Sequence, residues 1–279
     1  IVENSYGAIA NVDYITASYA SIRLGCIHLG RLVQDLVTWT GFEVSQIDVA
    51  DGFVQISSIM PQKRNPVPLE HLRLKLSLAA GGAEQIVQTM HNTPFADMND
   101  SERETQAAGF EVFERLGHAL PLLGSFVEAM KTNRASIENR IQKSMATITE
   151  LADTLVRAEG IGFRAAHHVA SKLAREALAR RIGFNELTWD LFARTFEELV
   201  GRAPQVERDV LASATSPENF VAVREMPGGP GPYVLREALA GYADRLAGLK
   251  AEAEDMRKRI AQAEALRNRL VSDVIAGEA

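Results

Sequence analysis

The C-terminal part of the chain carries the repeat that restricts its fold most strongly. Apolar side chains recur there at alternating steps of four and three residues: Leu235, Leu239, Tyr242, Leu246, Leu249, Ala253, Met256, Ile260 and Ala263. This spacing is the seam along which packed helices meet, so it predicts one long helix that packs on another helix. The segment MPGGPGPY at 226–233 comes before it and is predicted to be a non-helical turn, because proline lacks a backbone donor and glycine favours turns.

Helical periodicity also covers most of the preceding chain. The predicted helices are 13–39, 68–90, 101–131, 136–159, 163–181 and 186–200. Pro68 suits a first helical turn, and Ser101 with Glu104 has the spacing of a capping box. Residues 42–66 have no sustained period and form a long predicted loop, which is uncommon unless the loop is functional. Because no alternating pattern predicts a sheet, we expect an all-α protein.

Charge and cysteine content exclude several classes of protein. The 279 residues contain 30 Lys and Arg against 36 Asp and Glu, a net charge of −6, whereas a nucleic-acid binder normally has a basic surplus. The longest apolar runs are far shorter than the roughly 20 residues that cross a bilayer. The single Cys26 leaves no internal disulfide and fits a reducing compartment. We therefore expect a cytoplasmic protein without nucleic-acid or membrane partners. Because the chain opens at Ile1 directly before a helical pattern, we also expect it to be part of a longer protein.

One loop carries unusual chemistry. It is SSIMPQKRNP at 57–66, with two adjacent hydroxyls, a lysine, an arginine and a carboxamide. A solvated surface loop with a basic tip is the alternative interpretation. Polar loops on a helical scaffold are where function usually lies, and these groups offer proton acceptors and anion-binding cations. Zinc-type cysteine pairs and phosphate-binding loops are absent from the sequence. His167 and His168 are adjacent in a predicted helix and so diverge. We expect no metal and no cofactor.

The ten-residue loop strongly resembles the signature of the fumarase/aspartase superfamily, and within it the argininosuccinate lyases. LADTLVRAEGIGFRAAHHVASK at 151–172 and SPENFVAVREMPGGPGP at 216–232 resemble the small C-terminal domain of those lyases. Asn4, Ser5 and Asp13 resemble the approach to their long central helix. The resemblance implies a carbon–nitrogen lyase that eliminates fumarate from an N-substituted aspartate, most simply argininosuccinate.

The resemblance also implies a role for each polar residue of the loop. Ser57 would be the base that removes the Cβ proton, and a free hydroxyl is too weak for this unless cations or donors stabilise its alkoxide. Lys63 and Asn65 would bind the carboxylate on the fumarate side, and Ser58 could add a donor. Glu70 would orient a histidine that assists the leaving group and lies upstream of the present chain. The alternative for Glu70 is a solvated charge in a first helical turn.

The sequence departs from the family at two places. Ile56 stands where the family usually has glycine before the paired serines, so we expect a stiffer hinge. In the segment 94–105 the family carries tyrosine, glutamine and lysine, and this chain has Asp97, Glu102 and Thr105. Those family residues help to hold the part of the substrate that leaves as arginine. Asp97 and Glu102 are therefore predicted substrate-binding residues, and the identity of the amine stays open.

The resemblance further implies an architecture and partners. Residues 1–131 would form part of a central bundle of long helices, 132–225 a small helical domain, and 226–279 a turn and a long helix. The protein would be a homotetramer with active sites shared between subunits and a small dicarboxylate substrate. Three alternatives stay open: a lyase for another N-substituted aspartate such as ethylenediamine-disuccinate, a non-catalytic homologue of the lens-crystallin kind, and a helical interaction module.

Overall fold

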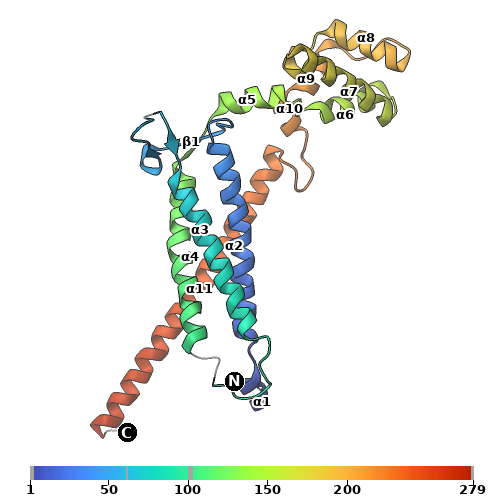
Figure 1. Ribbon diagram of the computed structural model, residues 1–279. Coiled ribbons are helices and arrows are strands. Elements are labelled where there is room, and N and C mark those ends of the chain that lie inside the picture. The colour runs from blue at the N-terminus through green and yellow to red at the C-terminus, as the bar shows by residue number, and fades with distance from the viewer. Residues whose placement is uncertain (1–2, 61, 100–102, 278–279) are drawn as a thin grey trace. The chain divides into compact units, whose positions relative to one another are not determined.

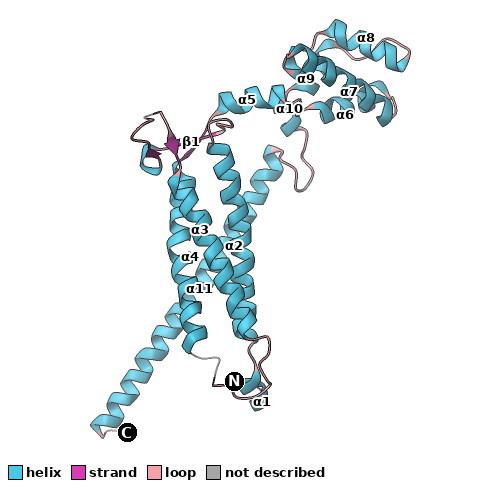
Figure 2. Cartoon of the chain, viewed as in Figure 1, coloured by secondary structure: helices cyan, strands magenta, loops and turns pink. Residues whose placement is uncertain are grey.

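The computed structural model describes residues 3–60, 62–99 and 103–277, and it is almost entirely helical (Figures 1 and 2). The chain divides into two compact units, Ile1–Glu138 and Asn139–Ala279. Each unit has its own apolar core. The all-α prediction is confirmed.

Three long helices lie side by side in the first unit: α2 (Asp13–Thr40), α3 (Val67–Thr89) and α4 (Arg103–Ala129) (Figure 1). A short helix, α1 (Ser5–Ala10), precedes them, capped by the Asn4 side chain. The bounds of the three long helices lie within two residues of the predicted ones. The predicted capping residue Ser101 lies outside the described residues. Leucine, valine, alanine and phenylalanine side chains from all three long helices fill the core, among them Val33, Leu36, Leu69, Leu72, Leu76, Val112 and Phe126.

Two glycines allow these helices to approach closely. A Cβ atom at Gly109 of α4 would lie 2.0 Å from the hydroxyl oxygen of Tyr19 in α2. A Cβ atom at Gly82 of α3 would lie 2.8 Å from Cγ2 of Val112 in α4. Both distances are shorter than a Cβ atom tolerates, so a larger residue at either position would force a neighbouring side chain or helix to shift. The packing of α3 between its neighbours therefore depends on small residues as well as on apolar ones.

The predicted loop 42–66 contains two short antiparallel ribbons that the sequence did not reveal. Strand β1 (Ile47–Val49) pairs with β4 (Met130–Thr132), which follows α4. Strand β2 (Gln55–Ile56) pairs with β3 (Arg64–Asn65), and the 3₁₀ turn η1 (Asp51–Phe53) lies between β1 and β2. Strands of two or three residues are too short to show an alternating pattern.

The second unit is a cluster of shorter helices around phenylalanine and leucine side chains. Its helices are α5 (Arg134–Lys143), which begins before the boundary between the units, α6 (Ile148–Glu159), α7 (Phe163–Arg180), α8 (Trp189–Val200), α9 (Arg208–Thr215) and α10 (Pro217–Ala222), with the 3₁₀ turn η2 (Phe184–Glu186). The prediction of one helix over 136–159 is wrong. The chain breaks at Met145, which has a φ of 56° and a buried side chain, and the hydroxyl of Thr147 donates to the carbonyl of Thr215 at 3.1 Å. Tertiary contacts therefore override the local periodicity.

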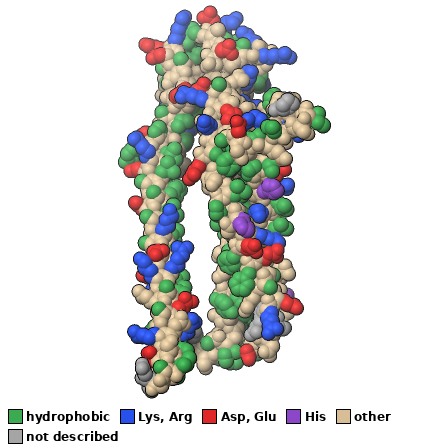
Figure 3. Space-filling view, turned by 90° about the vertical axis from the view of Figure 1, so that its left-hand side faces the viewer, with side chains coloured by type: hydrophobic (Ala, Val, Ile, Leu, Met, Phe, Trp, Pro, Cys, Tyr) green, Lys and Arg blue, Asp and Glu red, His purple; other side chains and the backbone are tan. Residues whose placement is uncertain are grey.

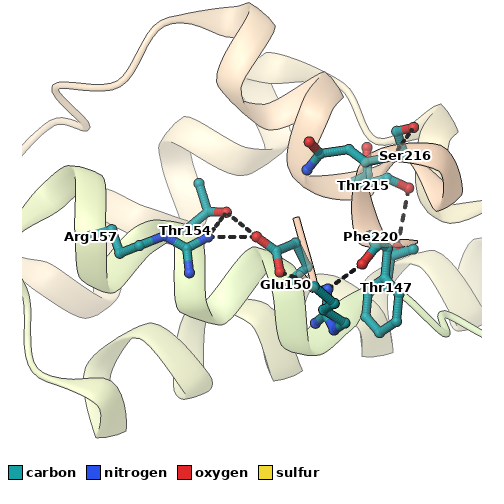
Figure 4. Close-up of polar contacts among 9 residues, drawn as sticks. Thr147, Glu150, Thr154, Arg157, Thr215, Ser216 and Phe220 are labelled. Atoms are coloured by element: carbon teal, nitrogen blue, oxygen red, sulfur yellow. Dashed lines mark hydrogen bonds and ion pairs between the residues drawn. The ribbon is translucent and has the colours of Figure 1, made fainter. Parts of the chain in front are cut away.

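A buried carboxylate, Glu150, organises one side of this unit (Figure 4). Its Oε1 accepts from Arg157 at 2.5 Å and from Thr154 at 3.2 Å, and its Oε2 accepts from Arg224 at 3.0 Å. The Arg224 guanidinium also lies 3.4 Å from the centroid of the Phe220 ring. A buried charge must be paired to be tolerated, so these contacts tie the segment after α10 to α6.

A second carboxylate, Glu159, closes the other end of α6. Its Oε1 accepts from the backbone N–H groups of Gln205 and Val206 at 2.7 and 2.8 Å, and its Oε2 accepts from Arg202 at 2.7 Å. Burial alone would raise the pKa of Glu159, but the hydrogen bonds from Val206, Arg202 and Gln205 outweigh it and lower the pKa below the ordinary 4.5.

The long helix predicted from the heptad repeat is α11 (Pro232–Ala276). It begins at Pro232, inside the predicted turn 226–233, because proline suits the first helical turn. None of its residues is buried within the chain, and its apolar stripe faces outward. Hydrophobic side chains lie at the surface along the long helices (Figure 3). None of the described helices combines the length and the apolar character that crossing a bilayer needs.

The clamp around Glu159 predicts a pH-dependent stability. Glu159→Gln should lower the free energy of unfolding of the second unit by about 1–3 kcal/mol at pH 7, because an amide group replaces one acceptor oxygen and faces buried donors. A group whose pKa is lowered by folding stabilises above its unfolded pKa and loses this contribution as the pH falls through the folded value. The difference between wild type and variant should therefore shrink below about pH 4.5.

Denaturant unfolding in a Trp39→Phe background measures this, because Trp189 of α8 then reports on the second unit alone. Glu252→Gln, at an exposed position of α11, is the matched control. A loss of stability equal to that of the control, or one that persists unchanged at pH 3, would contradict the assigned role of Glu159.

Candidate functional site

The signature loop projects from a small β-hairpin directly before α3. Strands β2 and β3 form the stem, and residues 57–60, 62 and 63 lie at the tip between them. Pro66 and Pro68 flank the first residue of α3, where proline is tolerated because first-turn N–H groups have no helical partner. The local sequence thus places the polar loop residues at the N-terminal end of a buried helix.

Ser57 has the most distinctive environment in this loop. Its side chain is half-buried, and its Oγ accepts hydrogen bonds from the backbone N–H groups of Ile59 and Met60, each at 3.2 Å. Donors aimed at an oxygen stabilise its negatively charged form. Ser57 is therefore in a position to carry negative charge, as a serine base must. The sequence did not indicate these two main-chain donors, because backbone directions depend on the fold of the loop.

The other polar residues of the predicted site follow Ser57 in the sequence. Ser58 and Lys63 are exposed, and Asn65 is half-buried in β3. The backbone N–H of Lys63 donates to the carbonyl of Met60 at 2.9 Å. Glu70 is exposed in the first turn of α3. The hairpin and the first helical turn thus hold five of the seven predicted site residues.

The remaining two predicted residues lie elsewhere. Asp97 is exposed in the loop that follows α3, and Glu102 lies outside the described residues. The 23 residues of α3 separate this loop from the signature hairpin, a distance of about 35 Å at about 1.5 Å per residue. Figure 1 shows β1 and α1 at opposite ends of α3. The Tyr6 hydroxyl in α1 donates to the carbonyl of Phe95 and so holds the loop at that far end. One chain therefore does not bring Asp97 and Ser57 together.

A cavity in the first unit lies away from the predicted site residues that the structure describes. A cavity of about 290 Å³ between α3 and α4 is lined by residues that include Gly81, Gln85 and Arg115, and by none of the predicted site residues. Within residues 3–60, 62–99 and 103–277, no three histidine, cysteine or acidic side chains gather so that they could hold a metal ion.

Two family profiles match the chain. The profile "Lyase" matches residues 1–81, which include the signature hairpin, and the profile "Argininosuccinate lyase C-terminal" matches residues 145–222. Argininosuccinate lyase 2 of Agrobacterium fabrum is 47% identical over 91% of the chain. The chain belongs to the argininosuccinate lyase-like members of the fumarase/aspartase superfamily.

Solved structures agree on the fold of this argininosuccinate lyase-like chain. A variant of EDDS lyase with bound fumarate has a TM-score of 0.89 and 24% identity, covering 100% of this chain and 55% of that one. A class II fumarase from Schistosoma mansoni has a TM-score of 0.56 and 17% identity, covering 77% and 41% of the two chains. At these identities the likeness shows the helical fold alone.

The matched proteins are longer than this chain. The chain covers 50% of the length of argininosuccinate lyase 2 of Agrobacterium fabrum. Argininosuccinate lyase 1 of Shouchella clausii is 26% identical over 95% of this chain, which covers 53% of that relative. The chain thus spans about half the length of the curated relatives that it matches.

Proposed function

We propose that the protein is a carbon–nitrogen lyase that splits argininosuccinate into arginine and fumarate. The observation that carries this proposal is the hairpin in which Ser57 accepts two backbone N–H bonds six residues before Lys63. A β-elimination needs a base for a weakly acidic proton and positive or donor groups around the charge that develops. This hairpin supplies both.

The reaction can be written with the residues of this chain. The Ser57 alkoxide removes the Cβ proton next to a carboxylate, and the electron pair delocalises into that carboxylate as a doubly negative aci-carboxylate. Lys63 and Asn65 hold the same carboxylate, so their contacts strengthen as its charge grows. The electrons then form the carbon–carbon double bond of fumarate while the C–N bond breaks and the amine leaves with a proton.

The leaving group needs a proton donor outside this hairpin. We assign Glu70 to orienting a histidine supplied by a part of the protein beyond the present chain, and Ser58 to donating a hydrogen bond to the substrate. Glu70 is exposed in the first turn of α3, so it is free to meet a residue from another chain or segment. The non-catalytic alternative is disfavoured because a crystallin-like role would not require Ser57, Lys63 and Asn65 together.

The relatives favour argininosuccinate over other N-substituted aspartates. A relative named argininosuccinate lyase is 47% identical to the chain, whereas EDDS lyase is 24% identical. The second candidate is a lyase that acts on ethylenediamine-disuccinate or on the aspartate derivative of a similar cationic amine. The observation that favours it is the carboxylate of Asp97, which lies in the loop assigned to the amine half of the substrate.

A homotetramer with shared active sites accounts for the geometry of the site residues. The hairpin and the loop of Asp97 lie at opposite ends of α3, so a single site that uses both must combine different subunits. Apolar side chains exposed on α2, α3, α4 and α11 offer the surface for such an assembly, because large exposed apolar patches mark association sites. In this proposal residues 1–131 and 226–279 supply long helices to a common bundle, and 132–225 form the small domain. The enzyme would act in the cytoplasm in arginine biosynthesis.

The assignment of the base predicts unequal effects at the paired serines. Ser57→Ala should reduce kcat by at least about 100-fold in the complete natural protein, because removal of a general base costs about 10²–10⁴-fold. Ser58→Ala should cost less, because it removes only a donor. Fumarate release measured by ultraviolet absorbance gives both rates, and circular dichroism with size-exclusion chromatography checks fold and assembly. Equal losses, or a larger loss at Ser58, would show that the wrong serine has been assigned.

The acidic far loop predicts an effect on substrate choice. Asp97 would repel the carboxylate of the leaving arginine, and like charges about 4 Å apart in water cost about 1 kcal/mol, or about fivefold in affinity. Asp97→Asn should therefore raise kcat/KM for argininosuccinate about fivefold and lower it for ethylenediamine-disuccinate.

Glu114→Gln on the exposed face of α4 removes the same charge away from the loop and is the matched control. The test compares the ratio of kcat/KM for argininosuccinate to kcat/KM for ethylenediamine-disuccinate. If this ratio is the same in Asp97→Asn as in Glu114→Gln, the loop does not contact the amine.

A further inference from the structure

Arg64 makes two directed contacts outside its own hairpin. Its Nη1 donates to Oδ1 of Asp51 at 2.7 Å, and its Nη2 donates to the backbone carbonyl of Val49 at 2.9 Å. Asp51 begins the η1 turn and Val49 ends β1. Two nitrogens of one planar guanidinium that bind two separate acceptors set its orientation as well as its position.

The two acceptors of Arg64 belong to backbone segments that are connected to the core of the unit. Val49 pairs with Met130 in the ribbon of β1 and β4. Phe53, at the end of η1, packs edge-to-face on the fully buried Phe126 of α4, with ring centroids 5.7 Å apart. Arg64 therefore links the hairpin to a ribbon and a turn that rest on the core of the bundle.

The hairpin of β2 and β3 is short. Its stem consists of two residue pairs, Gln55 with Asn65 and Ile56 with Arg64, and an isolated short hairpin is marginally stable. Ile56 is 67% exposed, so the stem gains little from apolar burial. The direction in which the tip projects thus depends on the side chain of Arg64.

We propose that Arg64 is a positioning residue that holds the signature hairpin in the geometry needed for elimination, an inference that rests on the function proposed above. Neighbouring residues of a strand point to opposite faces, so Arg64 is directed away from the face of Asn65. Arg64 acts through its neighbours Lys63 and Asn65 and does not bind the substrate. Arg64 thus positions the hairpin, whereas its neighbour Lys63 binds the substrate carboxylate.

The position of the anchor predicts how the kinetic constants change. Loss of the anchor lets the tip sample other orientations, which lowers the fraction of productive complexes. Arg64→Ala should therefore reduce kcat by about tenfold while KM changes by less than about threefold. Arg64→Lys retains one directed bond, so its kcat should lie between those of the wild type and Arg64→Ala. Asp51→Asn keeps an acceptor oxygen for Arg64 and leaves the Val49 contact intact, so it should lower kcat only about twofold.

The test measures catalysis and hairpin mobility separately in the complete natural protein. Hydrogen–deuterium exchange of a peptide that covers residues 55–66 reports on the hairpin, and argininosuccinate turnover reports on kcat and KM. Lys131→Ala, at an exposed position of β4, is the control for loss of one positive charge near the ribbon.

The proposal is supported if exchange in 55–66 rises in the order wild type, Arg64→Lys, Arg64→Ala while kcat falls in the same order. Unchanged exchange in Arg64→Ala, or a rise in KM at constant kcat, would overturn it, the second because Arg64 would then bind substrate directly. If the unaltered protein releases no fumarate, the proposed function fails. In that case faster exchange in Arg64→Ala still establishes the anchor, and unchanged exchange refutes it.

Discussion

Close packing of α3 between α2 and α4 determines where the chemistry of this chain is located. The small residues Gly82 and Gly109 let the helices approach, and one face of α3 is buried from Leu69 to Ile86 by leucine, alanine and isoleucine side chains. A helix held in this way is a rigid spacer of about 35 Å. The signature hairpin at its start and the loop of Asp97 after its end are therefore kept apart in every copy of the chain. An active site that uses both must be assembled from several copies, which makes oligomerisation a part of the proposed mechanism.

Short-range polar contacts then adapt the hairpin to its proposed task. The N–H groups of Ile59 and Met60 point at Ser57 Oγ, where an alkoxide would need them, and Arg64 joins the hairpin to the ribbon of β1 and β4. The long helices thus set the position of the hairpin on the scale of the whole unit, and a few hydrogen bonds set it locally. The second unit uses the same device for stability, where Glu159 holds the segment at Gln205.

Sequence periodicity predicted the long helices well because each has a wide apolar face, as in α2, α3 and α11. It failed at Met145, where a positive φ and burial against distant residues interrupt a helical pattern. It also missed the two ribbons, whose strands are too short to alternate. The motif at 57–66 identified the side chains of the candidate site. The donors to Ser57 and the anchor at Arg64 depend on backbone directions and long-range contacts that no local pattern contains.

Mixed oligomers test the central claim that the hairpin and the far loop of different copies form one site. Ser57→Ala removes the proposed base, and Asp97→Trp places a bulky uncharged ring in the loop at the other end of α3, where it should block the amine half of the substrate by its size. Each variant of the complete natural protein should release fumarate slowly when assembled alone. Co-assembly of the two should give fumarate release well above the average of the separate variants, because some sites then combine an intact hairpin with an intact far loop. Activity equal to that average, or full activity of Asp97→Trp alone, would contradict a site shared in this way.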